Sequence, residues 1–256
     1  MTGAPTPPEP VIRLRGLTRR FGGITAVRDV DLDVVHGERR AVLGPNGAGK
    51  TTLFNLVAGD YRPSSGTIEL FGRGVTRLPA HRRVATGLTR TYQRSNLFAA
   101  LTVRETLYLG LMGADSGHFA LRRRAATEER RRVAADQLIE RVGLEGRSDA
   151  LVGEISHGEQ RQLELAVALA GGPKLIMLDE PAAGLSAGER QLLTELLLSL
   201  ERDITIVLIE HDMDVALRVA DSVTLMHDGA VVIEGTPDEI RSSELVQALY
   251  LGSDHA

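Results

Sequence analysis

Hydrophobic residues follow two different patterns along the chain. In residues 12–15, Ile-Arg-Leu-Arg, apolar and polar side chains alternate, and the same period of two returns in residues 30–34 and 68–70. A strand with this pattern has one face in the core and the other in solvent. The three segments therefore predict an antiparallel sheet at the edge of the fold.

Three other segments are continuously apolar, namely residues 41–43, 175–178 and 204–209. Runs of this length are typical of parallel strands that are buried on both faces. They alternate with segments that have a helical pattern, such as residues 53–58. This alternation favours an α/β fold with a parallel sheet.

Helix starts are indicated by N-capping residues. Capping boxes open at Thr102, Ser156 and Ser186, and they predict helices that extend to residues 112, 170 and 200. Thr236 is followed by a proline and an acidic residue, which marks the start of a last helix. The Asp-Gly pair at residues 228–229 predicts a hairpin before it.

Residues 121–142 form an arginine-dense helical segment with arginine triplets at 122–124 and 130–132. Glu128 precedes Arg132 by four residues, and this spacing favours a solvent-exposed helix face. Contact with lipid head groups or with the loops of a partner is the alternative. Membrane recruitment of a variant neutralised at residues 122–124 distinguishes the two interpretations.

Residues 44–52 follow the first apolar run and have the pattern Gly-x-x-x-x-Gly-Lys-Thr. The glycines let backbone N–H groups approach a polyphosphate, and the N-terminus of the following helix favours an anion. In such a loop Lys50 reaches the β- and γ-phosphates and the Thr51 hydroxyl holds Mg²⁺. The stretch predicts a nucleotide-binding loop made of Gly44, Pro45, Asn46, Gly47, Ala48, Gly49, Lys50, Thr51 and Thr52.

Polar residues stand where the other two apolar runs end. Asp179 and Glu180 follow the run at 175–178, and His211 comes after the run at 204–209. Since open α/β sheets bind ligands at the carboxyl ends of their strands, we expect these side chains in one crevice. Asp179 is suited to hold Mg²⁺ through water and Glu180 to polarise an attacking water, whereas a purely structural His211 remains an alternative.

Two further features have both a structural and a functional interpretation. Phe21 lies between the first strands in a chain with 4% aromatic residues. Its ring either stacks on an adenine or belongs to the core or a turn. Ser156 and Gly158 either only begin a well-capped helix or also bind an anion at its N-terminus.

Composition narrows the class of protein. The 256 residues suffice for one large domain, with or without a subdomain. A net charge of −4 argues against a general nucleic-acid binder, and the lack of cysteine excludes disulfides and thiolate metal sites. No apolar run approaches the roughly 20 residues of a membrane span, so that any membrane role would come through a partner. The proline-rich residues 1–10 predict a disordered lead-in rather than a secretory signal.

Taken in order and spacing, these motifs resemble the ATP-binding cassette (ABC) ATPases. The specific set is the phosphate loop, Gln93, residues 156–160 (Ser-His-Gly-Glu-Gln), residues 178–181 (Leu-Asp-Glu-Pro) and His211. The resemblance implies a P-loop NTPase core with a parallel sheet, an N-terminal antiparallel β subdomain and an inserted α-helical signature subdomain.

In residue numbers, the resemblance implies one ABC ATPase domain over residues 11–252. Its helical subdomain would occupy approximately residues 94–160, and residues 253–256 would form a tail. The expected cofactors are ATP and Mg²⁺. The expected assembly is a head-to-tail dimer with two nucleotides at the interface.

The resemblance also implies a role for each site residue. The expected catalytic residues are Glu180 as the base, His211 as the clamp on the γ-phosphate, and Gln93 as the sensor of Mg²⁺. The expected metal-binding residues are Thr51, Gln93 and Asp179. The expected nucleotide contacts come from Phe21 and residues 44–52 of one subunit, and from Ser156, Gly158 and Glu159 of the other.

Among the cassettes, several stretches are similar in sequence to the corresponding stretches of the ATPases of branched-chain amino acid importers. These stretches are residues 21–27, 89–93, 179–185, 209–213 and 250–252. The resemblance implies two transmembrane permease subunits, a second ABC ATPase that is identical or a paralogue, and indirectly a solute-binding protein. It places the chain at the cytoplasmic face of the plasma (inner) membrane. The ATPases of urea or amide importers and of lipopolysaccharide exporters are similar in many of the same stretches.

Two positions depart from the family pattern. His157 stands where a glycine is common, and Ser186 stands where an aspartate is common. Whether position 186 still couples the two subunits of the dimer is therefore an open question. A soluble ABC ATPase without a transport role, such as an iron–sulfur assembly subunit, is the alternative class. The single phosphate loop argues against a ribosome-associated cassette, and the short spacing from Lys50 to Ser156 argues against a repair ATPase.

Overall fold

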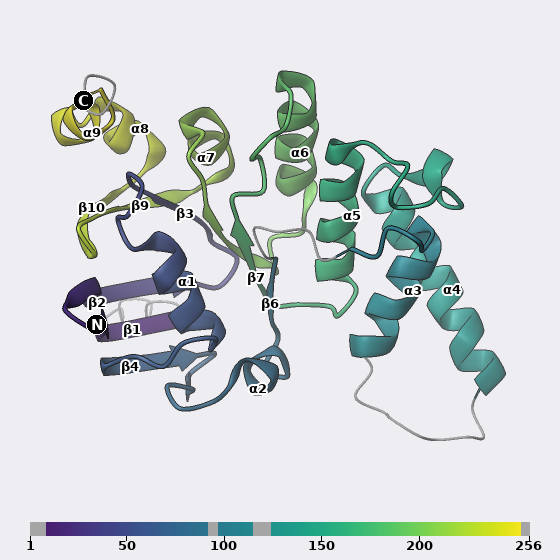
Figure 1. The fold of residues 1–256 in the computed structure, drawn as a ribbon, viewed down its shortest axis with the longest axis horizontal. Helices are drawn as coiled ribbons and strands as arrows, with labels where there is room; N and C mark the ends of the chain where they lie inside the picture. Colours follow the sequence, from purple (N-terminus) through teal and green to yellow (C-terminus); the bar gives the residue numbers. More distant parts are fainter. Residues whose placement is uncertain (1–8, 92–96, 115–123, 252–256) are drawn as a thin grey trace, which may run out of the picture.

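The computed structural model describes residues 9–91, 97–114 and 124–251. Gln93, Arg122 and Arg123 lie outside these residues, as do the predicted tail and the first eight residues of the predicted lead-in. The first strand begins at Pro10, so the last residue of that lead-in belongs to a sheet. The described residues form two β-sheets with helices around the larger one (Figure 1).

The smaller sheet is antiparallel and has the strand order β2-β1-β4-β5. Leu14 of β1 lies opposite Leu32 of β2 on one side and opposite Ile68 of β4 on the other. All three side chains are buried, so the structure has the antiparallel sheet with one buried face that the period-two pattern predicted. The strands are β1 (Pro10–Phe21), β2 (Ile24–Val35), β4 (Ser65–Leu70) and β5 (Arg73–Gly74).

The larger sheet has the strand order β10-β9-β3-β8-β7-β6. Its strands run parallel except β10, which forms the predicted hairpin with β9. The three continuously apolar runs are the buried strands β3, β7 and β8, as predicted. The strands are β3 (Arg39–Leu43), β6 (Leu88–Arg90), β7 (Leu175–Asp179), β8 (Thr205–Ile209), β9 (Ser222–His227) and β10 (Ala230–Gly235).

The predicted helix starts are confirmed, because Ser156, Ser186 and Thr236 each cap a helix with a complete capping box. Thr102 exchanges the same two hydrogen bonds with Glu105. The helices are α1 (Lys50–Ala58), α2 (Ala80–Val84), α3 (Val103–Ala114), α4 (Arg124–Arg141), a 3-10 turn (Glu145–Arg147), α5 (His157–Leu169), α6 (Ala187–Ser199), α7 (Met213–Val219), α8 (Pro237–Ser242) and α9 (Glu244–Leu251).

The core has two parts, one on each face of the larger sheet. On one face, Val42 and its neighbours on β7 and β8 pack with α1 and with the antiparallel sheet. On the other face, Ala41 and Leu43 pack with the residues of α5, α6 and α7. Alternate residues of one strand therefore serve two separate cores, which explains why these strands are apolar at every position.

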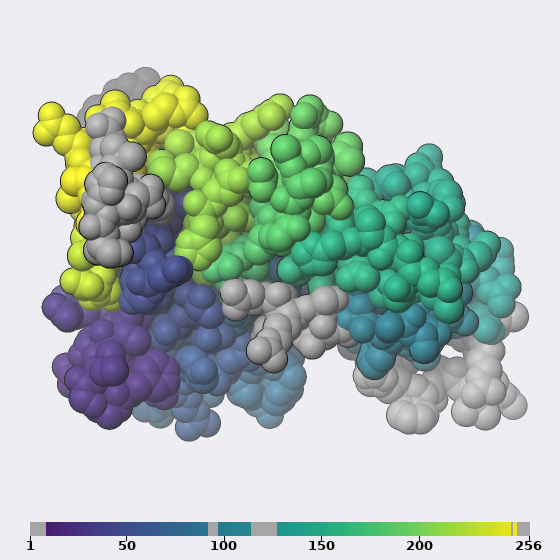
Figure 2. Space-filling view, turned by 45° about the horizontal axis from the view of Figure 1, so that its top comes forward, coloured from purple at the N-terminus to yellow at the C-terminus, as the bar shows by residue number. Residues whose placement is uncertain are grey.

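The helical segment between β6 and β7 contains α3, α4, the 3-10 turn and α5. Figure 2 shows it in teal as a lobe at one end of the molecule, away from the antiparallel sheet in purple. Its observed position agrees with an inserted helical subdomain, whose limits at residues 94 and 160 stay a prediction. No helix in the described ranges combines the length and apolarity that crossing a bilayer requires.

Candidate functional site

The phosphate loop joins the carboxyl end of β3 to the first residue of α1. Gly44, Gly47 and Gly49 have φ angles of 147°, 81° and 96°, a region that favours glycine. A Cβ atom on Gly49 would lie 2.2 Å from the carbonyl oxygen of Ala26, and one on Gly44 would lie 2.2 Å from that of Met226. The two outer glycines are therefore required by the packing of the loop as well as by its conformation.

The first turn of α1 presents its N–H groups to the loop. Its N-cap is Gly49, and no side chain among the described residues caps it. A helix N-terminus without a side-chain cap has unsatisfied donors and a favourable dipole for an anion. Thr51 is exposed and Thr52 is half-buried in this turn. Both residues therefore belong to the turn at which the phosphates and Mg²⁺ are predicted to bind.

Lys50 is folded back into the loop. Its Nζ donates hydrogen bonds to the carbonyl oxygens of Gly44 at 2.6 Å and Pro45 at 3.0 Å. Burial lowers its pKa, and the nearby carboxylates of Glu180 and Asp179 oppose that shift. The ammonium group is thus held at the mouth of the glycine loop, close to the two acidic residues at the end of β7.

Asp179 ends β7 and is almost fully buried, with 2% of its surface exposed. Its Oδ2 accepts a hydrogen bond from Arg90 Nη2 at 2.8 Å. Its Oδ1 is buried without a hydrogen-bond partner in the described part of the chain. Burial raises the pKa of Asp179, and the Arg90 guanidinium opposes the rise. An unpartnered carboxylate oxygen beside Lys50 fits the hydration shell of a Mg²⁺ ion, which prefers oxygen ligands.

Glu180 and His211 meet at the ends of neighbouring strands. The Nε2 atom of His211 lies 2.6 Å from Oε1 of Glu180, so the two residues that were expected to share one crevice are in contact. Glu180 has a φ of 51°, and its N–H donates to the Ile209 carbonyl at 2.9 Å. A non-glycine residue in this region is uncommon and carries a conformational cost, which is typical of functional sites.

Glu210 is a buried acid that the sequence reasoning did not single out. Its two oxygens accept the N–H groups of Ala182 at 2.8 Å and His211 at 3.2 Å. Burial raises its pKa to about 7, and these backbone hydrogen bonds oppose the rise. Glu210 therefore ties the loop after Glu180 to the backbone of His211. Its position directly after a buried strand was the sequence signal that could have identified it.

Residues 156–160, the Ser-His-Gly-Glu-Gln motif, begin a helix on the other face of the sheet from the phosphate loop. Ser156 Oγ accepts the N–H of Glu159 at 3.2 Å, and Glu159 Oε2 accepts the N–H of Ser156 at 2.7 Å. Helix α5, which they begin, belongs to the core opposite the one that contains α1. Ser156, Gly158 and Glu159 are consequently grouped with each other and separated from Lys50.

The two departures from the family pattern lie next to each other. Gly158 donates its N–H to Glu189 Oε1 at 3.1 Å, and Ser186 Oγ donates to Glu189 Oε2 at 2.7 Å. A Cβ atom on Gly184 would lie 3.2 Å from Cε1 of the His157 ring. Serine at position 186 keeps the helix cap, and Glu189 joins that cap to the start of α5.

Phe21 ends β1 and is not a core residue, since 39% of its surface is exposed. The Arg19 guanidinium carbon lies 4.4 Å from the centre of its ring, and the Tyr61 ring meets it edge-on at 5.4 Å. These contacts hold the Phe21 ring in place while part of it stays accessible. Stacking on an adenine remains a prediction that this exposure permits.

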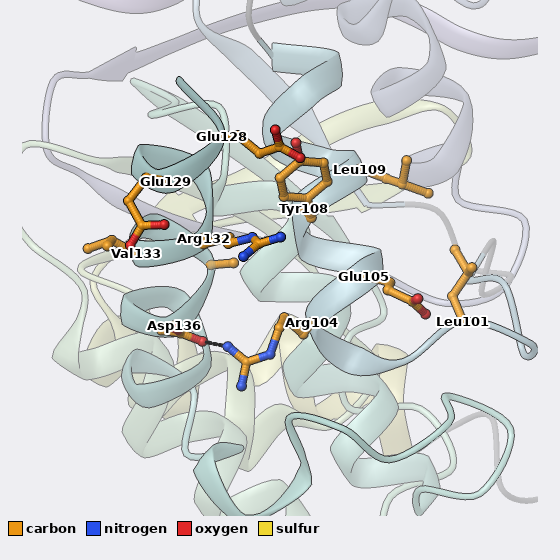
Figure 3. A pocket seen from close by; sticks show the side chains of 11 residues that line it. Leu101, Arg104, Glu105, Tyr108, Leu109, Glu128, Glu129, Arg132, Val133 and Asp136 are labelled. Carbon is orange, nitrogen blue, oxygen red and sulfur yellow. Dashed lines mark hydrogen bonds and ion pairs between the residues drawn. The ribbon is translucent and has the colours of Figure 1, made fainter. Parts of the chain in front are cut away.

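A groove lies between α3 and α4 on the helical segment, with a volume of about 720 Å³ (Figure 3). Its walls combine exposed apolar side chains with charged ones. Arg104 forms an ion pair with Asp136 across it (Figure 3). Leu109 and Val133 expose 46% and 48% of their surfaces at its edge. A groove that combines exposed apolar side chains with charged ones is typical of a surface that binds another chain.

Comparison with known proteins identifies relatives along nearly the whole chain. The model of the ABC transporter family matches residues 27–183. The high-affinity branched-chain amino acid transport ATP-binding protein BraF of Pseudomonas aeruginosa is 37% identical over 95% of this chain and 98% of its own.

Solved structures give the same result. An ATP-binding cassette of an ABC transporter in its ADP conformation has a TM-score of 0.83 and 27% identity over 95% of this chain and 99% of its own. A dimeric cassette bound to ADP and phosphate has a TM-score of 0.75 and 25% identity over 88% of this chain and 98% of its own. The coverage of these chains extends across both sheets and the helical segment.

Proposed function

We propose that this chain, which belongs to the ABC transporter family and is an ATP-binding, ATP-hydrolysing subunit of that family, powers the uptake of branched-chain or related amino acids. The observation that carries the proposal is the full-length similarity to a branched-chain amino acid transport ATP-binding protein. The contact between Glu180 and His211 supports the part of the proposal that concerns ATP hydrolysis.

In this proposal the glycine loop and Lys50 bind the β- and γ-phosphates of ATP, with Thr51 and Thr52 at the first turn of α1. Asp179 and Thr51 would hold Mg²⁺, together with Gln93 as the resemblance implies. When bound there, Mg²⁺ would supply positive charge that offsets the negative charge on the phosphates. Phe21 supports the adenine ring by stacking.

Glu180 acts as the general base for the attacking water. Its carboxylate is partly buried, with 14% of the side chain exposed, and His211 Nε2 holds one of its oxygens. A carboxylate held in this way at the end of β7 is suited to accept a proton from the attacking water. His211 also holds the γ-phosphate, and the Glu210 hydrogen bond to its N–H keeps the loop in place.

The working unit is a head-to-tail dimer in this proposal. Ser156, Gly158 and Glu159 lie apart from the phosphate loop of their own chain, so they are available to the nucleotide of a second subunit. The similarity to a dimeric cassette that holds ADP and phosphate supports this arrangement. The second subunit is an identical copy or a paralogue.

The groove between α3 and α4 is the proposed contact with a transmembrane permease subunit. It lies on the lobe that follows Gln93, and its apolar and charged walls suit a short amphipathic helix. A solute-binding protein would act on the permease from the other side of the membrane. The chain would then be located peripherally at the cytoplasmic face of the inner membrane.

The test is affinity purification of the tagged chain from its own membranes in mild detergent, followed by mass spectrometry. We expect two polytopic membrane proteins and a second ABC ATPase, and stimulation of ATP hydrolysis by a branched-chain amino acid with its binding protein in reconstituted vesicles. Stimulation by urea, a short amide or lipopolysaccharide instead would overturn the proposal that branched-chain amino acids are the substrate. Recovery of scaffold proteins without any membrane protein would favour a soluble ABC ATPase.

A further inference from the structure

Arg90 reaches the nucleotide site from a strand that contains none of the functional motifs. It ends β6, the edge strand of the larger sheet, and lies opposite Met177 of β7, two residues before Asp179. Only 5% of its side chain is exposed. A guanidinium that is buried to this degree must have its charge and its donors matched by neighbouring groups.

The partners of Arg90 lie on two separate parts of the site. Nη2 donates to Oδ2 of Asp179 at 2.8 Å, while Nη1 donates to Oδ1 of Asn55 at 2.6 Å and to Oδ2 of Asp60 at 2.9 Å. The guanidinium carbon lies 5.9 Å from the centre of the Phe54 ring. Arginine is suited to such a bridge because its planar fork presents several donors in fixed directions.

The bridge determines which oxygen of Asp179 is available. Oδ2 is engaged by Arg90, whereas Oδ1 has no hydrogen-bond partner in the described ranges. Asn55 lies on α1, the helix that begins at Lys50 and Thr51. One guanidinium therefore holds both the carboxylate at the end of β7 and the helix that starts at the phosphate loop.

We infer that Arg90 is the positioning residue of the Mg²⁺ site, because it orients the Asp179 carboxylate so that Oδ1 faces the ion while Asn55 and Asp60 anchor the guanidinium. The inference rests on the proposed function, in which Asp179 holds Mg²⁺. Outer partners of metal ligands commonly contribute 10- to 100-fold to metal affinity. A salt bridge that serves only the fold would contribute to stability and leave metal affinity unchanged.

The experiment measures binding of a fluorescent ATP analogue to the purified full-length chain, first in EDTA and then during a Mg²⁺ titration. Arg90→Met is expected to raise the Mg²⁺ midpoint of the binding curve by about 10- to 100-fold. Binding in EDTA should stay within about twofold of the wild type, because the glycine loop and Lys50 are intact. Arg90→Lys should give a smaller rise, since a single ammonium replaces the fork.

Arg40→Met is the matched control for the loss of a buried arginine. Arg40 bridges Glu38 and Glu234 in the same sheet, through contacts that do not include Asp179. This variant should have a lower thermal stability than the wild type and an unchanged midpoint in the Mg²⁺ titration. An equal shift in Arg40→Met and Arg90→Met would show a general effect of destabilisation and would overturn the inference.

Asp179→Asn separates failure of this inference from failure of the proposed function. An unchanged midpoint in Asp179→Asn would mean that Asp179 does not hold Mg²⁺. A raised midpoint in Asp179→Asn together with a wild-type midpoint in Arg90→Met would overturn the role of Arg90 alone. If Arg90→Met does not fold, Arg90→Lys and Asp60→Asn provide the test, and wild-type midpoints in both would contradict the inference.

Discussion

The imidazole Nε2 of His211 lies 2.6 Å from Oε1 of Glu180, although 31 residues separate them in the chain. The contact forms because β7 and β8 are adjacent and parallel, with Asp179 opposite Ile209. The residues that follow the two strands therefore emerge side by side. This pair is the part of the site on which hydrolysis is expected to depend.

Glu180→Gln should abolish ATP turnover and preserve ATP binding. The amide has the shape of the carboxylate but cannot accept a proton from water, so we expect a decrease in kcat of at least about 100-fold. Phosphate release and binding of a fluorescent ATP analogue measure the two properties separately. Glu195→Gln, on the exposed face of α6, is the control and should behave as the wild type. Near-normal turnover in Glu180→Gln would assign the base to another residue.

The Glu180–His211 pair should behave as one unit in a double-mutant cycle. His211→Ala alone is expected to lower kcat by about 100-fold. Because each residue acts through the other, Glu180→Gln combined with His211→Ala should be no slower than the slower single variant. Single-turnover phosphate release measures this directly. Effects that multiply would show that the two side chains contribute independently.

Gly49→Ala should disrupt the phosphate loop. A Cβ atom there would lie 2.2 Å from the Ala26 carbonyl oxygen, and the φ of 96° disfavours any other residue. Nucleotide affinity should fall by more than about tenfold, together with a loss of thermal stability. Gly188→Ala is the control, since α6 has open space at that position and alanine favours a helix by roughly 1 kcal/mol. Wild-type affinity in Gly49→Ala would contradict the described loop.

Stability should depend on pH through Glu210. Burial raises its pKa from 4.5 to about 7, so the folded chain keeps this proton to a higher pH than the unfolded chain does. The free energy of unfolding should consequently decrease as the pH rises from about 4.5 to about 7, by roughly 3 kcal/mol. Glu210→Gln should remove this part of the slope, whereas Glu195→Gln should retain it. Denaturant unfolding across this pH range is the measurement, and parallel profiles for wild type and Glu210→Gln would refute the assignment.

Features that depend on residues close together in the sequence were predicted correctly. The capping boxes at Ser156 and Ser186 each involve side chains three residues apart, so the pattern contains all that is needed to recognise them. The phosphate loop could be recognised for the same reason, because its residues are contiguous in the sequence. The roles assigned to Gln93 stay predictions, because that residue lies outside the described ranges.

Two contacts that depend on how distant elements pack together were not predicted. Arg90 and Asp179 are 89 residues apart and meet only because β6 pairs with β7. Gly158 and Glu189 meet because the N-termini of α5 and α6 lie together. Nothing in the composition around these residues specifies the partner, since charged side chains on a strand end or a helix start are common.

The chain leaves the larger sheet after its edge strand, β6, and returns to it as β7. The helical lobe is therefore inserted at a margin, while the strands that carry the phosphate loop, Glu180 and His211 are adjacent in the middle of the sheet. Such a layout separates the groove between α3 and α4 from those three strands. A lineage could reshape that groove, and so acquire another membrane partner, while it keeps the strands that carry the phosphate loop, Glu180 and His211.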